Sequence, residues 1–264
     1  MSFHNGAAYL GMYDLPASRP AQDIWWQGLA GHFAAHGLSN VPMHLERSGA
    51  DPYDIWLSPD LFFAQTCGYP LTHRLAGKVR LLGTPCYDAP GCDGPRYRSL
   101  IIVRDGSKAK TLAAALPARV AVNGMDSYSG WHALGATLAQ LGLDEDPFCE
   151  IVISGGHMNS IDLVREGAAD LAAIDCITFA LAGDVEPERL AGLTVLHQSE
   201  AAPGLPYITR AGMTDLDAVA MSEAIKDAFA DPDLAPAREA LRLAGFSQVP
   251  LAQYRRFMGE DLIA

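Results

Sequence analysis

Hydroxyl-bearing residues crowd the segment Ser127-Tyr128-Ser129-Gly130, which lies between an apolar run and a stretch of helical periodicity. Asp126, Ser127 and Ser129 are each competent helix N-caps, although a helix needs only one. One interpretation is a turn in which one residue caps the helix and the others are incidental. The other is a cradle in which the hydroxyls and the N–H groups around Gly130 hold an anion, favoured by the helix dipole.

Covalent chemistry at these serines lacks the expected spacing. A nucleophile elbow has glycine two residues before the serine, whereas Met125 precedes Ser127 and Ser127 itself precedes Ser129 at that position. The Walker phosphate loop is also missing, as are HExxH and CxxC pairs. The sequence therefore predicts no catalytic residue, no metal and no cofactor.

Polar residues also follow two later apolar runs. His157 comes after Ser154 and a glycine pair, where backbone can approach a ligand closely, and it is either a capping residue or a ligand contact. Asp175 ends the apolar run that starts at Asp170. A buried carboxylate is rare unless it is paired, so Asp175 is either a helix cap or a ligand acceptor.

The first half of the chain offers weaker candidates. Gln65 and Thr66 end another apolar run, and helix capping is the alternative role for them. Tyr13 and Tyr97 lie at opposite ends of their predicted strands, where each phenol either faces a cleft or packs in the core. Together these residues suggest that several strand ends point neutral or anion-tolerant groups toward one crevice.

The elements that position these residues are predicted by short apolar runs, which alternate with segments of helical periodicity. This alternation is typical of an α/β protein with mainly parallel strands. The predicted strands cover residues 7–13, 60–65, 78–85, 97–104, 119–123, 149–156, 170–175 and 192–200. A helix from about Ser129 has an apolar stripe of Trp131, Leu134, Leu138 and Leu141, and the chain after about Asp215 reads as helices. In open α/β sheets, ligands bind outside the carboxyl ends of the strands.

Composition excludes several functions. With 264 residues, about half of them apolar, the chain can fill a real core, and its net charge of −12 argues against binding to nucleic acid or an anionic membrane. No stretch approaches the roughly 18 apolar residues of a membrane span. Five scattered cysteines suit a reducing compartment, and only Cys86 and Cys92 are close enough in sequence to invite a disulfide.

Several motifs, in their order along the chain, resemble the phosphate/phosphite/phosphonate substrate-binding proteins of ABC transporters. They are DLFFAQTCGYPL, GTPCYDAPGCDGPRYRSLIIVR, SYSGWHAL, SGGHMNSIDLVREGAADLAAIDCITFAL and APGLPYIT. The resemblance implies a type II periplasmic-binding-protein fold, in which two α/β lobes joined by two crossover strands close on a ligand in the cleft between them. Residues 1–100 and 205–264 would form lobe one, and residues 101–204 lobe two.

The resemblance also implies a site and a role. The anion would be gripped at Ser127, Ser129 and Gly130, with further contacts from Tyr97, His157 and Asp175. Tyr128 replaces the family's small hydroxyl residue, which implies a different pocket size. The implied function is non-catalytic capture of a small oxyanion by hinge closure, with an ABC-transporter permease as partner if the protein is exported.

Two alternatives remain open at this point. One is a biosynthetic enzyme on the same fold, with His157 and Asp175 as acid and base; the other is a cytoplasmic ligand sensor. The opening MSFHNGAAYLGMYDLP lacks the basic start and the roughly 7 to 15 apolar residues of a secretory signal. As written, the chain is expected to be cytoplasmic, and periplasmic only if a leader has been removed.

Overall fold

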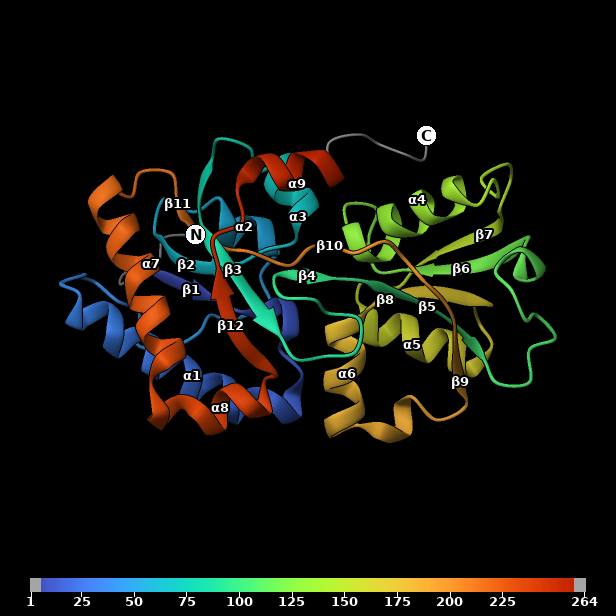
Figure 1. The fold of residues 1–264 in the computed structure, drawn as a ribbon, viewed down its shortest axis with the longest axis horizontal. Helices are drawn as coiled ribbons and strands as arrows, with labels where there is room; N and C mark the ends of the chain where they lie inside the picture. Colours follow the sequence, from blue (N-terminus) through green and yellow to red (C-terminus); the bar gives the residue numbers. More distant parts are fainter. Residues whose placement is uncertain (1–5, 259–264) are drawn as a thin grey trace. The chain divides into compact units, whose positions relative to one another are not determined.

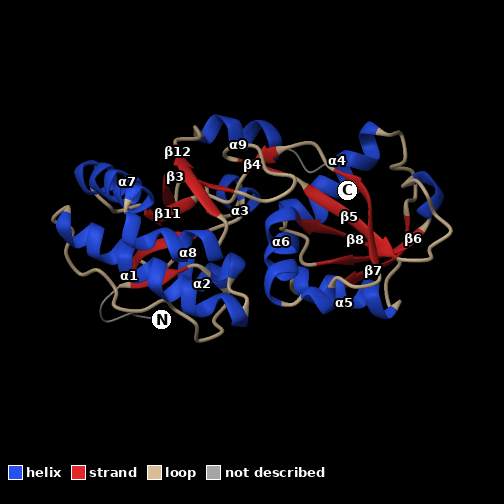
Figure 2. Cartoon of the chain, turned by 60° about the horizontal axis from the view of Figure 1, so that its bottom comes forward, coloured by secondary structure: helices blue, strands red, loops and turns tan. Residues whose placement is uncertain are grey.

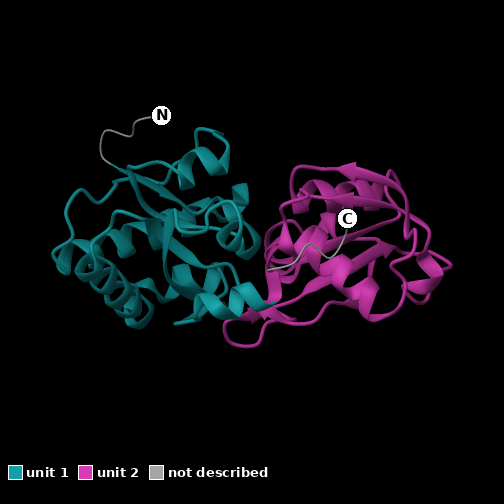
Figure 3. Ribbon diagram, turned by 90° about the horizontal axis from the view of Figure 1, so that it is seen from above, with its two compact units in different colours: residues 1–88, 203–256 teal, residues 89–202, 257–264 magenta. Residues whose placement is uncertain are grey.

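The computed structural model describes residues 6–258, which divide into two compact units (Figure 3). Residues 6–88 and 203–256 form unit 1, and residues 89–202 form unit 2 together with residues 257 and 258. The chain passes from unit 1 to unit 2 after Asp88, earlier than the sequence-based boundary at residue 100, and returns after Ala202. The assignments of residues 1–5 and 259–264 lie outside the described residues.

Unit 1 is built on a five-stranded sheet in the order β1-β2-β11-β3-β12 (Figure 1). Only β1 and β2 pair in parallel; β11 is antiparallel to β2 and β3, and β12 is antiparallel to β3. Its strands are β1 (Ala7–Tyr9), β2 (Leu61–Gln65), β3 (Val79–Tyr87), β11 (Tyr207–Arg210) and β12 (Leu243–Ser247). Its helices are α1 (Arg19–Ala35), α2 (Pro52–Trp56), α3 (Gly68–Thr72), α7 (Asp215–Ala230), α8 (Ala235–Ala240) and most of α9 (Leu251–Met258).

Unit 2 has its own five-stranded sheet, in the order β7-β6-β8-β5-β9. Helices α4 and α5 cover opposite faces of this sheet (Figures 1 and 2). The strands are β5 (Ser99–Arg104), β6 (Ala118–Val122), β7 (Phe148–Ile153), β8 (Leu171–Asp175) and β9 (Leu193–Gln198). The helices are the π-helical turn η4 (Tyr128–His132), α4 (Ala133–Gln140), α5 (His157–Glu166) and α6 (Cys176–Val185). The short strands β4 (Arg96–Tyr97) and β10 (Ala202–Pro203) precede β5 and follow β9.

The sheets are mixed, so the expectation of mainly parallel strands is wrong. Parallel pairs occur where a strand, a helix and the next strand follow one another, as in β6 and β7. Strands that are not joined to a neighbour in this way pair antiparallel. Strand β5, for example, is antiparallel to both β8 and β9. The sequence reading of the C-terminal part as helices alone also missed β12, a short strand with glycine at its centre.

The apolar stripe after Ser129 forms the core of unit 2 as expected, with one exception. Trp131, Leu134 and Leu138 are buried against side chains of β5, β6 and β8. Leu141 lies beyond the last turn of α4 and is 48% exposed, so its place in the stripe is wrong. Among residues 6–258, no helix combines the length and apolar character that crossing a bilayer requires.

Candidate ligand site

One edge of the unit 2 sheet collects the polar residues singled out in the second half of the sequence. Strands β7 and β8 both run parallel to β6, so the carboxyl ends of all three lie at the same edge. Each of these ends leads into a helix: β6 into η4 and α4, β7 into α5, and β8 into α6. Strand β5 runs antiparallel to β8 and pairs Ser99 with Asp175, which brings its amino end to this edge. Three helix starts therefore meet where an anion is best received.

The first helix start is a tight, buried turn. Ser127 has extended backbone, and its Oγ accepts a hydrogen bond of 3.1 Å from the N–H of Gly130. The N–H groups of Trp131 and His132 both reach the carbonyl of Ser127, which gives the turn its π-helical form. The Gly130 N–H is thus already engaged in the cap, whereas the Ser127 hydroxyl proton is still available for donation.

Gly130 occupies a place that no larger residue fits. A Cβ on Gly130 would lie 1.8 Å from Oδ1 of Asn123 and 3.3 Å from Oγ of Ser127. The Asn123 oxygen is buried, and no hydrogen-bond donor in the described chain reaches it. Glycine therefore lets the turn pack directly on Asn123.

Ser129 and His157 link the first helix start to the second. Ser129 Oγ lies 2.8 Å from Nε2 of His157, the first residue of α5. Burial lowers the pKa of His157 to about 4, so the imidazole is neutral at neutral pH. Its Nδ1 is buried without a partner among residues 6–258. If the neutral ring carries its proton on Nε2, the atom left without a partner, Nδ1, is only an acceptor. His157 then donates a hydrogen bond to Ser129 Oγ, and the hydroxyl proton of Ser129 points away from His157.

Asp175 caps the third helix start and is 1% exposed. Its Oδ1 accepts hydrogen bonds from the N–H groups of Ile177 at 2.7 Å and Thr178 at 3.2 Å. The capping alternative for Asp175 is therefore confirmed by the geometry.

The two tyrosines of this unit are both buried. Tyr128 lies within η4 at 5% exposure, and Tyr97 lies in β4, two residues before Ser99, at 1% exposure. Tyr97 thus belongs to the same edge as Asp175 by chain position. Both phenols are interior groups, which is the packing role that the sequence left open for Tyr97.

The remaining predicted residues belong to unit 1. Gln65 and Thr66 lie at the carboxyl end of β2, whereas Tyr13 lies in a short 3-10 helix after β1, which ends at Tyr9 and not at residue 13 as predicted. Gln65 Nε2 donates to the hydroxyl of Tyr87 at 3.2 Å and to the carbonyl of Leu205 at 3.0 Å. Tyr13 packs edge-on against Tyr87, with ring centroids 5.2 Å apart. The N–H of Thr66 donates to the carbonyl of Pro206. These contacts bring Tyr13 and Gln65 into one buried cluster around Tyr87.

Sequence reasoning missed Tyr87 and Asn123. Tyr87 is the last residue of a strand, which is the signal that selected Gln65. In the sequence, however, its aromatic ring does not stand out as a polar end of the run Val79–Tyr87. Asn123 lies within the segment that attracted attention, yet only the position of the Gly130 backbone shows that it forms the wall of the turn.

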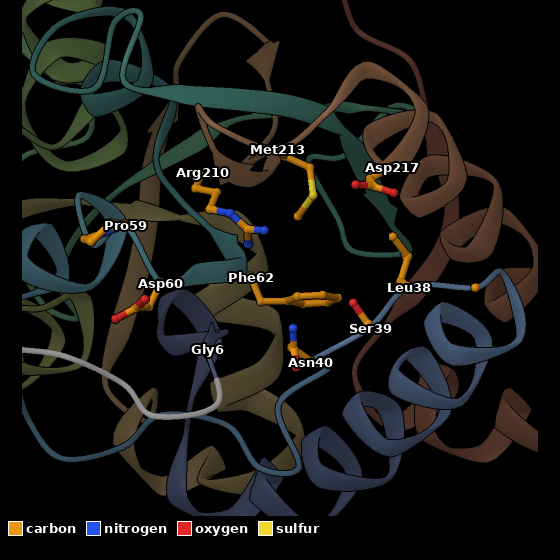
Figure 4. Close-up of a pocket in the computed structure, with 11 residues that line it drawn as sticks. Gly6, Leu38, Ser39, Asn40, Pro59, Asp60, Phe62, Arg210, Met213 and Asp217 are labelled. Atoms are coloured by element: carbon orange, nitrogen blue, oxygen red, sulfur yellow. The ribbon is translucent and has the colours of Figure 1, made fainter.

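A hollow of about 410 Å³ occurs elsewhere in unit 1 (Figure 4). It lies at the amino ends of β1 and β2, between Asn40, Asp60 and the guanidinium of Arg210. This is the opposite end of those strands from Gln65. Arg210 also donates to the carbonyl of Leu61.

The geometry argues against acid–base or covalent catalysis. Ser129 and His157 are at the distance of a nucleophile and its base, but no group in the described chain orients Nδ1 of His157. A pKa near 4 also makes His157 a weak base at neutral pH. Asp175 is already engaged as a helix cap by two backbone N–H bonds. Within residues 6–258, no group of three His, Cys, Asp or Glu side chains is arranged to hold a metal ion.

The fold and the site define a binding protein of the periplasmic-binding-protein type. Residues 58–254 match the sequence model of the periplasmic phosphonate substrate-binding proteins of ABC transporters, which covers most of the chain. The chain belongs to this family. Its members are non-catalytic solute-binding proteins that work with an ABC transporter, so the protein is a solute-binding protein rather than an enzyme. No curated protein matches the chain.

Solved structures show the same fold at low sequence identity. The binding-protein component of an ABC phosphonate transporter from Pseudomonas aeruginosa has a TM-score of 0.73 at 17% identity, over 96% of this chain and 87% of its own. PhnD1 from Prochlorococcus marinus, in complex with methylphosphonate, has a TM-score of 0.71 at 14% identity, over 95% and 94%. The arginine-, lysine- and histidine-binding protein ArtJ from Geobacillus stearothermophilus has a TM-score of 0.57 at 13% identity, over 97% and 96%.

Proposed function

We propose that the protein captures a small oxyanion, a phosphate, a phosphonate or a related compound, at the carboxyl edge of the unit 2 sheet. The pairing of Ser129 with a neutral His157 carries this proposal. It frees the Ser129 hydroxyl as a donor at the point where the starts of two helices meet. Helix dipoles and neutral donors bind an anion without a net positive charge, in keeping with the acidic chain.

Asp175 gives the proposed site its selectivity. A carboxylate repels a fully ionised anion but accepts a hydrogen bond from one that retains a proton. Phosphate and phosphonates carry such a proton near neutral pH, whereas sulfate does not. The site therefore favours phosphorus oxyanions that retain a proton over sulfate, because the Asp175 carboxylate repels a fully ionised anion more strongly.

A thermal-shift and calorimetric comparison of inorganic phosphate, methylphosphonate, sulfate and arginine tests the proposal. Phosphate or methylphosphonate is expected to raise the Tm and to bind at least ten-fold more tightly than sulfate. Arginine is the control ligand, because an ancestral arginine-binding protein of similar fold is bound to arginine. Ser129→Ala is expected to weaken anion binding by roughly ten-fold, as one charge-assisted hydrogen bond is lost. Binding of arginine alone, or binding of none of the anions, would refute the proposal. Equal binding of sulfate and phosphate would refute the selectivity assigned to Asp175.

The proposed partner is the permease of an ABC transporter, and the proposed location is the cytoplasm for the chain as written or the periplasm if a leader has been removed. The family description supports the permease and the periplasmic alternative. If a leader is removed in the natural host, the protein is expected to appear in the periplasmic fraction and to crosslink to a permease in the presence of phosphate or methylphosphonate. Recovery of the full-length natural protein only from the cytoplasm would contradict the periplasmic alternative.

A further inference from the structure

Two cysteines that are far apart in the sequence meet in unit 2. The sulfur of Cys92 lies 3.7 Å from the sulfur of Cys176. Cys92 lies in the turn after the chain enters the unit, and Cys176 is the buried first residue of α6, 84 positions later. In the sequence, Cys86 is the only cysteine close enough to Cys92 to invite a disulfide. In the structure Cys86 lies in β3 of unit 1, with its sulfur 3.4 Å from the hydroxyl of Ser247.

The local backbone is arranged to hold the two thiols together. Gly91 adopts φ = +103°, and a Cβ there would lie 3.1 Å from Cβ and 3.2 Å from Sγ of Cys176. The turn therefore packs directly on Cys176, which a larger residue in its place would prevent. On the other side, the N–H of Cys176 donates to the carbonyl of Arg98 at 3.1 Å. The N–H of Cys92 donates to the carbonyl of Ala89 at 2.9 Å, so backbone contacts hold both cysteines.

We propose that Cys92 and Cys176 are a redox-active pair that closes a disulfide and clamps the turn before Tyr97 onto the start of α6. Cys176 directly follows Asp175, so the clamp fixes the third helix start of the candidate ligand site. The inference rests on the thiol geometry and holds whether or not the ligand is an oxyanion.

The step is ordinary thiol–disulfide exchange with a small-molecule disulfide such as oxidised glutathione. The half-buried Cys92, as the thiolate, attacks one sulfur of the oxidant and forms a mixed disulfide, releasing the first reduced thiol. Cys176 then attacks the Cys92 sulfur and expels the second. Two protein thiols and one oxidant disulfide become one protein disulfide and two free thiols. The hydrogen bond to Cys92 and burial both raise the pKa of the Cys176 thiol, which makes Cys92 the first nucleophile.

Peptide mapping after equilibration with oxidised or reduced glutathione tests the pair. In the oxidised protein we expect a crosslinked peptide joining Cys92 to Cys176, with Cys67, Cys86 and Cys149 still open to alkylation after unfolding. The crosslink is expected to raise the Tm by about 5–15 °C over the reduced protein, because it closes a long loop. Cys92→Ser is expected to abolish both effects. Cys86→Ser is the matched control, and it is expected to keep both.

Three results would overturn the inference. One is a crosslink between Cys86 and Cys92 instead. The second is complete alkylation of Cys92 and Cys176 after exposure of the folded protein to excess oxidised glutathione. The third is a crosslink that leaves the Tm unchanged, since a clamp must stabilise the folded state. Cys92→Ser removes the less buried of the two thiols, so the variant is expected to fold.

Discussion

Replacing Gly130 with alanine is expected to weaken binding of phosphate or methylphosphonate by at least ten-fold and to lower the free energy of unfolding by about 1–3 kcal/mol. The added Cβ would lie 1.8 Å from Oδ1 and 2.8 Å from Cγ of Asn123. Because these contacts are impossible, either the Asn123 side chain or the turn must move. Movement of the turn displaces Ser127 and Ser129 from the positions that let them face an anion. Calorimetric titration and urea unfolding measure the two effects.

Gly31→Ala is the matched control for this change. Gly31 lies on the exposed side of α1 in unit 1, and a Cβ there meets no atom within 4 Å. Alanine in a helix is favoured over glycine by roughly 0.5–1 kcal/mol, so this variant is expected to be slightly stabilised, with unchanged affinity. If Gly130→Ala behaves like Gly31→Ala, the turn at residues 127–130 does not position the ligand.

Acidification is expected to destabilise the folded protein through His157 in particular. The pKa of His157 is about 4 in the folded state and about 6.5 in an unfolded chain. Between these values the unfolded state binds a proton that the folded state does not, so stability falls as the pH drops through this window. From pH 7 to pH 5 this one residue is expected to remove about 2 kcal/mol from the free energy of unfolding. Urea unfolding at the two pH values measures it.

The comparison with His157→Gln isolates this contribution. Glutamine keeps a hydrogen-bonding group beside Ser129 but does not titrate, so the variant is expected to lose about 2 kcal/mol less than the wild type between pH 7 and pH 5. The control is His44→Gln, because His44 is an exposed histidine of unit 1. It is expected to show the full wild-type dependence. Equal pH dependence of all three proteins would mean that His157 is not held neutral by burial.

The motif resemblance predicted the family. Apolar runs bounded by polar residues, which are local signals, predicted the α/β class and most strand positions. The run ending at Asp175 is a strand, β8, as its pattern indicates, and Asp175 caps the next helix, which is one of the two roles that the sequence left open. The apolar spacing from Trp131 to Leu138 likewise identified the buried face of α4. The assignment of Ser127, Ser129 and Gly130 to a helix start followed from cap chemistry, and the structure places them there.

What escaped prediction depends on contacts between distant residues. The 2.8 Å contact of Ser129 with His157 and the approach of Cys92 to Cys176 arise from strand order, which the sequence does not display. Cys86 and Cys92 are close enough in sequence to invite a disulfide, yet the chain passes from one unit to the other between them. The strand directions were misjudged for a similar reason, since β5 enters its sheet antiparallel to β8.

The role of the unit 1 residues is the least determined by sequence. Gln65 is a polar residue at a strand end, which fits a ligand contact as well as a structural one. In the structure its amide ties Tyr87 and Leu205 together within the unit. Tyr87 and Leu205 lie 22 and 140 residues from Gln65 in the sequence, so only the folded structure reveals these contacts.

A crystal structure of the protein grown with methylphosphonate tests the central claim most directly. The account predicts density for the phosphonate within hydrogen-bonding distance of Ser129 Oγ, at the edge of unit 2 where His157 and Asp175 also begin their helices. A phosphonate bound instead beside Arg210 in the unit 1 hollow, or no phosphonate at a concentration that saturates binding in solution, would contradict it.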